Sequence, residues 1–175
     1  MQSPIKKTHL IDLFISENDI SVCTSLLDYL EGEKPLDSVH VPGSTATHLV
    51  CKGFAKRITK RILKWILKLG KAGWSLFGKL TAKDFWVTPL QQIKVSSKRL
   101  DDLMPSTREG TRADMRSVGQ VIRGMFSAGK KGKNDIPYNF KHLLRLLKNY
   151  KKIYALILEH HPAGMSEYRC PSEGG

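Results

Sequence analysis

The pattern of apolar and polar residues predicts a short β-hairpin near the start of the chain. Residues Leu10–Ile15 and Ile20–Thr24 are rich in apolar and β-branched side chains, and the polar residues Ser16–Asp19 separate them. Two such runs on either side of a polar turn favour an antiparallel pair of strands. The next stretch, residues 31–48, contains several glycines and prolines, and we expect no regular secondary structure there.

Residues 49–69 have a helical pattern, because apolar side chains recur at every third or fourth position and basic side chains lie largely between them. The apolar positions are Phe54, Ile58, Ile62, Ile66 and Leu69. The basic positions are Lys56, Arg57, Lys60, Arg61, Lys64 and Lys68. We therefore predict an amphipathic helix that ends at Gly70 or Gly73.

The remaining chain predicts a second hairpin and then mostly helices. Residues Phe85–Thr88 and Ile93–Val95 form the hairpin. A helix with a broad apolar face is expected to start at Asp114, which is a suitable N-cap residue. Two further helices are expected around Phe140–Asn149 and Ile153–His160. Hairpins and helices in this order predict an α+β fold.

Charge is the unusual feature of the composition. The chain has 29 Lys and Arg residues against 16 Asp and Glu residues, which gives a net charge of +13. This balance favours acidic partners, such as an acidic protein surface, anionic lipid or nucleic acid. The sequence shows no recognisable nucleic-acid-binding module, so only the clustered cations point to nucleic acid.

The three cysteines, Cys23, Cys51 and Cys170, are far apart and lack the spacing of a metal site. They are expected to be reduced thiols in a cytoplasmic or nuclear protein. The first residues show no apolar region of a secretory signal. No apolar run approaches the roughly 18–20 residues of a membrane span. We therefore expect no transmembrane segment.

The order of these elements resembles that of a protein kinase from its fourth strand onward, over roughly Leu10–Pro162. Residues Gly78–Thr88 are similar to the catalytic loop and the strand that follows it. Residues Asp114–Gly119 resemble the Asp-x-x-Ser-x-Gly that opens the central helix of the large lobe, which gives structural roles to Asp114, Ser117 and Gly119. The resemblance implies that the carboxylate of Asp114 binds the backbone of the catalytic loop.

The resemblance implies a mostly helical kinase large lobe with two small hairpins and a remnant of the small lobe. Residues 1–30 would be that remnant and the hinge, 31–48 a linker, 49–165 the large lobe, and 166–175 a disordered tail. The hinge, where a kinase backbone meets adenine, would lie at Thr24, Ser25, Leu26 and Leu27. With so little of the small lobe, Leu13, Ile15 and Val22 would lack sheet partners, which predicts local disorder, a partner strand or self-association.

Several positions depart from the family pattern. Lys79 stands where a kinase has the aspartate that accepts the substrate proton, and a protonated amine cannot do so. Ser97 stands where a carboxylate holds the metal, while Asp84, in place of an asparagine, could still be a metal ligand. The Gly-rich loop and the ATP-anchoring lysine are not in the chain. The activation segment is short and lacks Ala-Pro-Glu, and Lys152 replaces the arginine that would pair with that glutamate.

These departures indicate a catalytically inactive, pseudokinase-like domain that acts as a scaffold or regulator through protein contacts, either with an active kinase or with itself. No cofactor is expected, and ATP binding at the hinge is left open. One alternative is a Ser/Thr kinase represented by an incomplete chain. Another is that residues Lys52–Lys68 form a basic amphipathic helix that binds anionic membrane or nucleic acid. Against this alternative, the apolar face of that helix could instead pack inside the domain.

Overall fold

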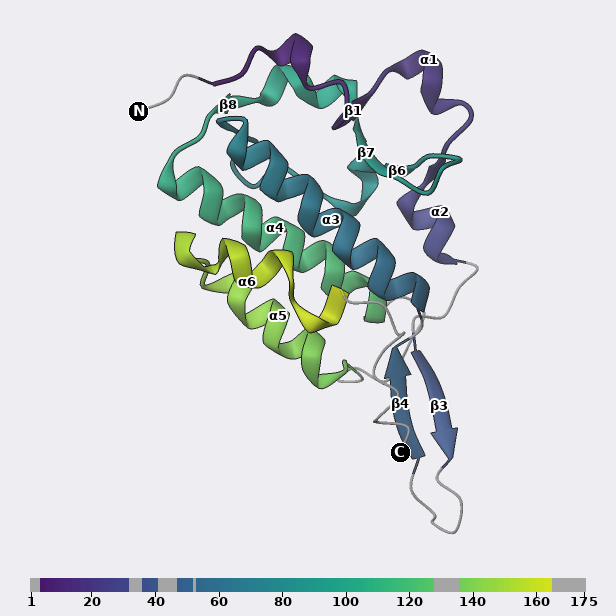
Figure 1. Cartoon of the computed structure of the whole chain (residues 1–175). Coiled ribbons are helices and arrows are strands. Elements are labelled where there is room, and N and C mark those ends of the chain that lie inside the picture. The colour runs from purple at the N-terminus through teal and green to yellow at the C-terminus, as the bar shows by residue number, and fades with distance from the viewer. Residues whose placement is uncertain (1–3, 32–35, 41–46, 52, 128–135, 165–175) are drawn as a thin grey trace.

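The computed structural model describes residues 4–31, 36–40, 47–51, 53–127 and 136–164. Its helices are α1 (Glu17–Ile20), α2 (Leu26–Glu31), α3 (Gly53–Lys71), α4 (Arg108–Ser127), α5 (Tyr138–Lys148) and α6 (Ala155–Glu159). Its strands are β1 (Phe14–Ile15), β2 (Thr24–Ser25), β3 (Leu36–His40), β4 (Thr47–Cys51), β5 (Trp74–Ser75), β6 (Phe85–Val87), β7 (Ile93–Ser96) and β8 (Met104–Pro105). Short 3₁₀ helices are η1 (Lys7–His9), η2 (Ala82–Asp84), η3 (Ser97–Asp102), η4 (Lys152–Tyr154) and η5 (Pro162–Gly164). The fold is α+β and mostly helical, as predicted (Figure 1).

Helix α3 lies at the centre of the fold and contacts α4, α6, η5, β5 and β7. Its buried apolar side chains are Phe54, Ala55, Ile58, Ile62, Leu63, Trp65, Ile66 and Leu69. Full burial of one such aliphatic side chain contributes about 1.5–3 kcal/mol, so this face accounts for much of the core. The amphipathic helix predicted from the sequence is confirmed, although it starts at Gly53 because residues 49–51 belong to β4.

The second predicted hairpin is also confirmed, as β6 and β7 pair antiparallel with Phe85 opposite Val95 and Val87 opposite Ile93. All four of these side chains are buried, while the alternate residues are partly exposed. Alternation of this kind places one face of a strand pair on the core. The pair forms the middle of a four-stranded sheet in the order β1-β7-β6-β2.

The first predicted hairpin is wrong. Strand β1 pairs parallel with β7, and β2 pairs antiparallel with β6, so the two segments lie at opposite edges of the sheet. The polar residues between them begin helix α1, because the Ser16 hydroxyl accepts a hydrogen bond from the Asp19 backbone amide and caps the helix. Leu13 and Ile15 are buried within the chain and do not lack partners, whereas Val22 is 67% exposed.

Residues 36–40 and 47–51 form the antiparallel hairpin β3–β4. No secondary structure was expected up to residue 48, and residues 49–51 were expected to begin the long helix. The glycines and prolines of residues 31–48 were the reason for expecting no regular secondary structure there. The strands themselves contain β-branched residues, including Val39, Thr47 and Val50, which favour extended backbone. Figure 1 shows this hairpin projecting away from the helices.

Helix α4 starts at Arg108, so Asp114 is buried in the body of the helix and is not its N-cap. Helix α5 packs on α4, with the rings of Phe126 and Phe140 edge to face at 4.8 Å. The predicted helices near residues 140–149 and 153–160 are both present, the second as η4 followed by α6. The expected disordered tail, 166–175, lies outside the described residues.

Candidate functional site: a loop with an arginine between two aspartates

The loop that follows α3 is held by one buried carboxylate. Asp114 accepts hydrogen bonds from the hydroxyl of Ser75 at 2.7 Å and from the backbone amides of Leu76 and Gly78 at 3.1 and 3.0 Å. Ser117, one turn further along α4, donates its hydroxyl to the carbonyl of Gly78 at 2.9 Å. Burial raises the pKa of Asp114, and the three hydrogen bonds oppose that rise. The loop is therefore pinned to α4 at several points.

Glycine is needed at two places in this arrangement. Gly78 has a φ of +82°, a left-handed conformation that other residues seldom adopt. At Gly110, in the first turns of α4, an added Cβ would lie 2.8 Å from both the ring of Phe77 and the hydroxyl of Ser75. The helix can approach the loop so closely only because position 110 has no side chain.

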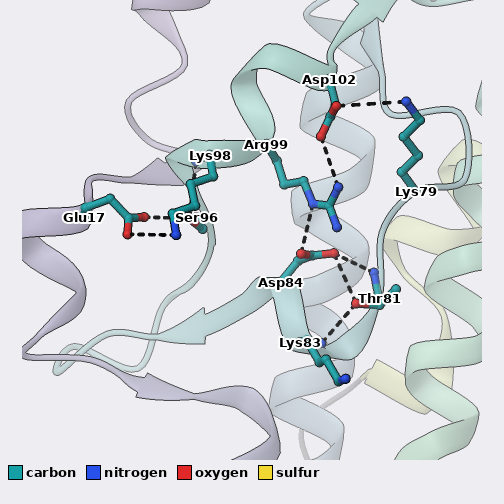
Figure 2. Close-up of polar contacts among 9 residues, drawn as sticks. All are labelled: Glu17, Lys79, Thr81, Lys83, Asp84, Ser96, Lys98, Arg99 and Asp102. Carbon is teal, nitrogen blue, oxygen red and sulfur yellow. Dashed lines mark hydrogen bonds and ion pairs between the residues drawn. The ribbon is translucent and has the colours of Figure 1, made fainter.

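Asp84, in η2, lies at the centre of the polar cluster drawn in Figure 2. Its Oδ2 atom accepts from the Thr81 backbone amide at 2.8 Å and from the Thr81 hydroxyl at 3.2 Å. Its Oδ1 atom accepts from Nε of Arg99 at 3.0 Å. Since Asp84 is only 12% exposed, both of its oxygens are committed to contacts within the chain.

Arg99, in η3, joins two carboxylates. Its Nη1 donates to Oδ2 of Asp102 at 3.0 Å while its Nε donates to Asp84 (Figure 2). These hydrogen bonds raise the pKa of Arg99, so the guanidinium stays charged. Lys79 lies 4.0 Å from Oδ1 of Asp102 and is 59% exposed. The cluster is a partly buried arrangement of two anions and two cations.

The sequence placed Lys79, Asp84 and Ser97 in this region, and the structure brings their segments together. Lys79 lies in the loop between α3 and β6, and Ser97 is the first residue of η3, directly after β7. The sequence reasoning did not identify the roles of Arg99 and Asp102. Arg99 is 15 residues from Asp84 along the chain, and no local pattern signals a pair at that separation.

The four residues expected at the hinge, 24–27, are not part of the polar cluster around Asp84 and Arg99 that Figure 2 draws. Thr24 and Ser25 make up β2, Leu26 is buried at the start of α2, and Leu27 is exposed. Leu27 lines a cavity of about 440 Å³ whose apolar walls come from α2, α4 and the loop. The other apolar side chains of the wall are Leu30, Leu80, Ala82, Val121 and Met125.

The basic face of α3 remains at the surface, with Arg57, Lys60, Lys64 and Lys68 exposed and Lys56 and Arg61 partly buried. Arg61 donates to the carbonyl of Gln91. None of the ion pairs between described residues involves a cation of this helix. The apolar face of α3 is in the core, so the folded chain cannot insert that face into a membrane.

Two histidines form a pair that the sequence did not indicate. His161 is 3% exposed, its Nδ1 accepts from the Ala163 backbone amide at 3.0 Å, and its Nε2 lies 2.8 Å from Nδ1 of His142. Burial, with the neighbouring His142, lowers the pKa of His161 to about 4. His161 is therefore neutral at neutral pH. Within the described ranges, no three His, Cys, Asp or Glu side chains gather as a metal site.

Comparison with known proteins adds no family to these observations. No protein-family model matches the chain, and no curated protein matches it either. Among the helices that the structure describes, none is both long and apolar enough to cross a bilayer. The interpretation of the site therefore depends on its own geometry.

Proposed function

We propose that this chain is a kinase-like domain that does not transfer phosphate and that acts through contacts with other proteins, as a scaffold or as a regulator of an active kinase. The observation that carries the proposal is the position of Arg99, whose guanidinium lies between the carboxylates of Asp84 and Asp102. In phosphate transfer, carboxylates in this part of a kinase hold metal and accept a proton. The resemblance puts Lys79 and Ser97 at those two positions, and the carboxylates that are present nearby, Asp84 and Asp102, neutralise a cation of the same chain.

The fixed loop supports the kinase-like part of the proposal. The resemblance implies a carboxylate at position 114 that binds the backbone of the catalytic loop, and Asp114 accepts from the amides of Leu76 and Gly78. The strand before this loop, β5, pairs with β8, which follows η3. The loop and the segment after Ser97 are thus held next to each other, as a kinase-like site requires.

The residues do not fit a bound Mg²⁺. A kinase-like site would hold the metal with the side chains at positions 84 and 97. Both oxygens of Asp84 are already bound, and the charged guanidinium of Arg99 at 3.0 Å would repel a divalent cation. Ser97 contributes a neutral hydroxyl in place of a carboxylate.

The proton acceptor is missing in the same way. Lys79 lies in the loop where the acceptor would be needed, and its ammonium lies 4.0 Å from Oδ1 of Asp102. An ammonium has donors and no acceptor, so it cannot take a proton from a hydroxyl. Loss of the base and loss of the metal site are separate changes, and both point to an inactive domain.

A phosphate-transfer assay tests the proposal. The purified chain is incubated with Mg-ATP and a basic protein substrate, with Asp84→Ala as a matched control that has no side-chain oxygen at this position. We expect no transfer above that of the control. Transfer by the wild-type chain that disappears in Asp84→Ala would overturn the proposal, because Asp84 would then be free to act in catalysis. A thermal-shift titration with ATP, with and without Mg²⁺, tests separately whether nucleotide binds, and we expect that Mg²⁺ adds nothing.

A further inference from the structure

Three large aliphatic side chains on one side of α6 and η4 are exposed. Ile153, Leu156 and Ile157 are 76%, 70% and 46% exposed, and we call them the α6 patch. Their spacing of three and four residues places them on the same face of the helical segment. Leu158, next in sequence, points into the core and is 1% exposed. The helix is thus anchored by one side chain and presents three others outward.

Lysines flank the patch. Lys148, Lys151 and Lys152 are all exposed, and none takes part in an ion pair between described residues. Glu159 is the acidic residue nearest to the patch along the chain, and it is only partly exposed. The surface therefore combines apolar side chains with unpaired positive charge, in a chain whose net charge is +13.

We propose that the α6 patch and its lysines bind the surface of an anionic lipid bilayer, with the aliphatic side chains inserted at the level of the headgroups. Peripheral membrane-binding elements combine these two features, apolar side chains that enter the interface and basic side chains that contact anionic lipid. The proposal is independent of whether the domain is kinase-like. It also differs from an interaction through α3, whose apolar face is buried.

A lipid surface fits this patch better than a protein does. Lysine is depleted at the centre of protein interfaces, where Tyr, Trp and Arg supply most of the binding energy. The α6 patch has only aliphatic residues, and lysines stand beside it at Lys151 and Lys152. Each lysine close to an anionic surface strengthens binding about fivefold. Charge complementarity therefore selects an anionic membrane.

Sedimentation with vesicles tests the proposal on the full chain. The probes are vesicles of phosphatidylcholine alone and vesicles with about 30% phosphatidylserine, each at about 0.1 M and about 0.5 M salt. The apolar variant combines Ile153→Ser, Leu156→Ser and Ile157→Ser, and these surface changes should leave the fold intact, which a thermal melt checks. The matched control is Leu90→Ser, because Leu90 is 79% exposed on the β6–β7 turn.

We expect the wild-type chain and Leu90→Ser to bind the anionic vesicles, and the triple serine variant to bind about tenfold more weakly or worse. Binding to phosphatidylcholine alone should be much weaker, and high salt should reduce binding to the anionic vesicles. Equal binding by the triple variant and the wild type would overturn the proposal. The proposal would also be overturned if the wild-type chain did not bind vesicles and dimerised through the α6 patch, because the patch would then bind a second copy of the chain.

A second pair of variants separates the patch from the basic face of α3. One replaces Lys148, Lys151 and Lys152 by Gln, and the other replaces Arg57, Lys60 and Lys64 by Gln. Both remove three positive charges, so a difference between them reports position and not net charge. We expect the first to weaken vesicle binding more. An equal or larger loss in the α3 variant would overturn the proposal and identify α3 as the contact.

Discussion

Nε of Arg99 donates to Oδ1 of Asp84 at 3.0 Å, and the two residues come from separate 3₁₀ helices on either side of the β6–β7 hairpin. Through this contact the chain supplies its own cation to a carboxylate that could otherwise bind a metal. On the proposed function, this contact stabilises the loop and also excludes a metal, and both expected consequences can be measured.

Replacement of Arg99 by Ala should lower stability and create metal binding. The change leaves Asp84 and Asp102 without their shared cation, and we expect a loss of about 1–2 kcal/mol in the free energy of unfolding. Mg²⁺ or Mn²⁺ should then raise the melting temperature of the variant but not of the wild type. Lys98→Ala is the control, because Lys98 is 76% exposed and, among the residues that the structure describes, forms an ion pair only with Glu17, at 3.6 Å. Equal metal shifts in Arg99→Ala and the wild type would contradict this interpretation.

Asp114→Asn should destabilise the chain by about 2–3 kcal/mol. The carboxylate accepts from two backbone amides on different oxygens, so either orientation of an asparagine amide would turn its NH₂ group toward a backbone N–H. Urea denaturation measures the change. Asp101→Asn makes the same chemical change at an exposed position and should be nearly neutral. A similar, small effect in both variants would mean that Asp114 does not hold the loop.

Gly110→Ala tests the close approach of α4 to the loop. The new methyl group would lie 2.8 Å from the Phe77 ring and the Ser75 hydroxyl, and we expect a loss of roughly 1–3 kcal/mol. At Gly70, also in a helix, an added Cβ meets nothing within 4 Å. Gly70→Ala should therefore be neutral or stabilising by up to about 1 kcal/mol. A melting temperature for Gly110→Ala as high as that of Gly70→Ala would show that the loop lies elsewhere.

Stability should fall as the pH drops from 6.5 toward 4, in part because of His161. Its pKa is lowered from 6.5 to about 4 in the folded chain, so the unfolded chain takes up a proton first. The stabilisation is complete above pH 6.5 and is lost as the pH falls toward the folded value, by up to about 3 kcal/mol. Urea midpoints measured between pH 6.5 and 4 for the wild type and His161→Gln give the contribution of His161 to the pH dependence of stability.

His160→Gln is the control for that measurement, because His160 is the exposed neighbour of His161. It should keep the pH dependence of the wild type, while His161→Gln should show a flatter profile between pH 6.5 and 4. A wild-type slope in His161→Gln would mean that other groups cause the acid sensitivity.

The strongly periodic segments could be predicted from the sequence alone. The spacing of Phe54, Ile58 and Ile62 required one buried helical face, and the alternation in Phe85–Val87 and Ile93–Ser96 required a strand pair with one face on the core. Such patterns are local, because each repeat matches one secondary structure and puts its apolar side chains on one side.

Other elements depended on contacts that the local pattern does not contain. Leu10–Ile15 and Ile20–Thr24 looked like partners, yet each adds to a different edge of the β6–β7 pair. Each strand of the β6–β7 hairpin has an outer edge whose backbone groups can pair with one of these segments. The residues between the two segments form helix α1, capped by Ser16, and not the tight turn that a hairpin between them would need. Asp114 looked like an N-cap, but the helix begins six residues earlier, at Arg108. The carboxylate of Asp114 instead accepts hydrogen bonds from backbone amides of the loop that follows α3.

In the candidate site, the sequence alone gives the chemical character of Lys79 and Ser97, because the chemistry of an amine or a hydroxyl belongs to the residue itself. It could not show that Arg99 would fill the space between Asp84 and Asp102, nor that His161 would meet His142. Those pairs join residues that are distant along the chain, and only the packing of η3 against the loop and of η5 against α5 brings their atoms within bonding distance.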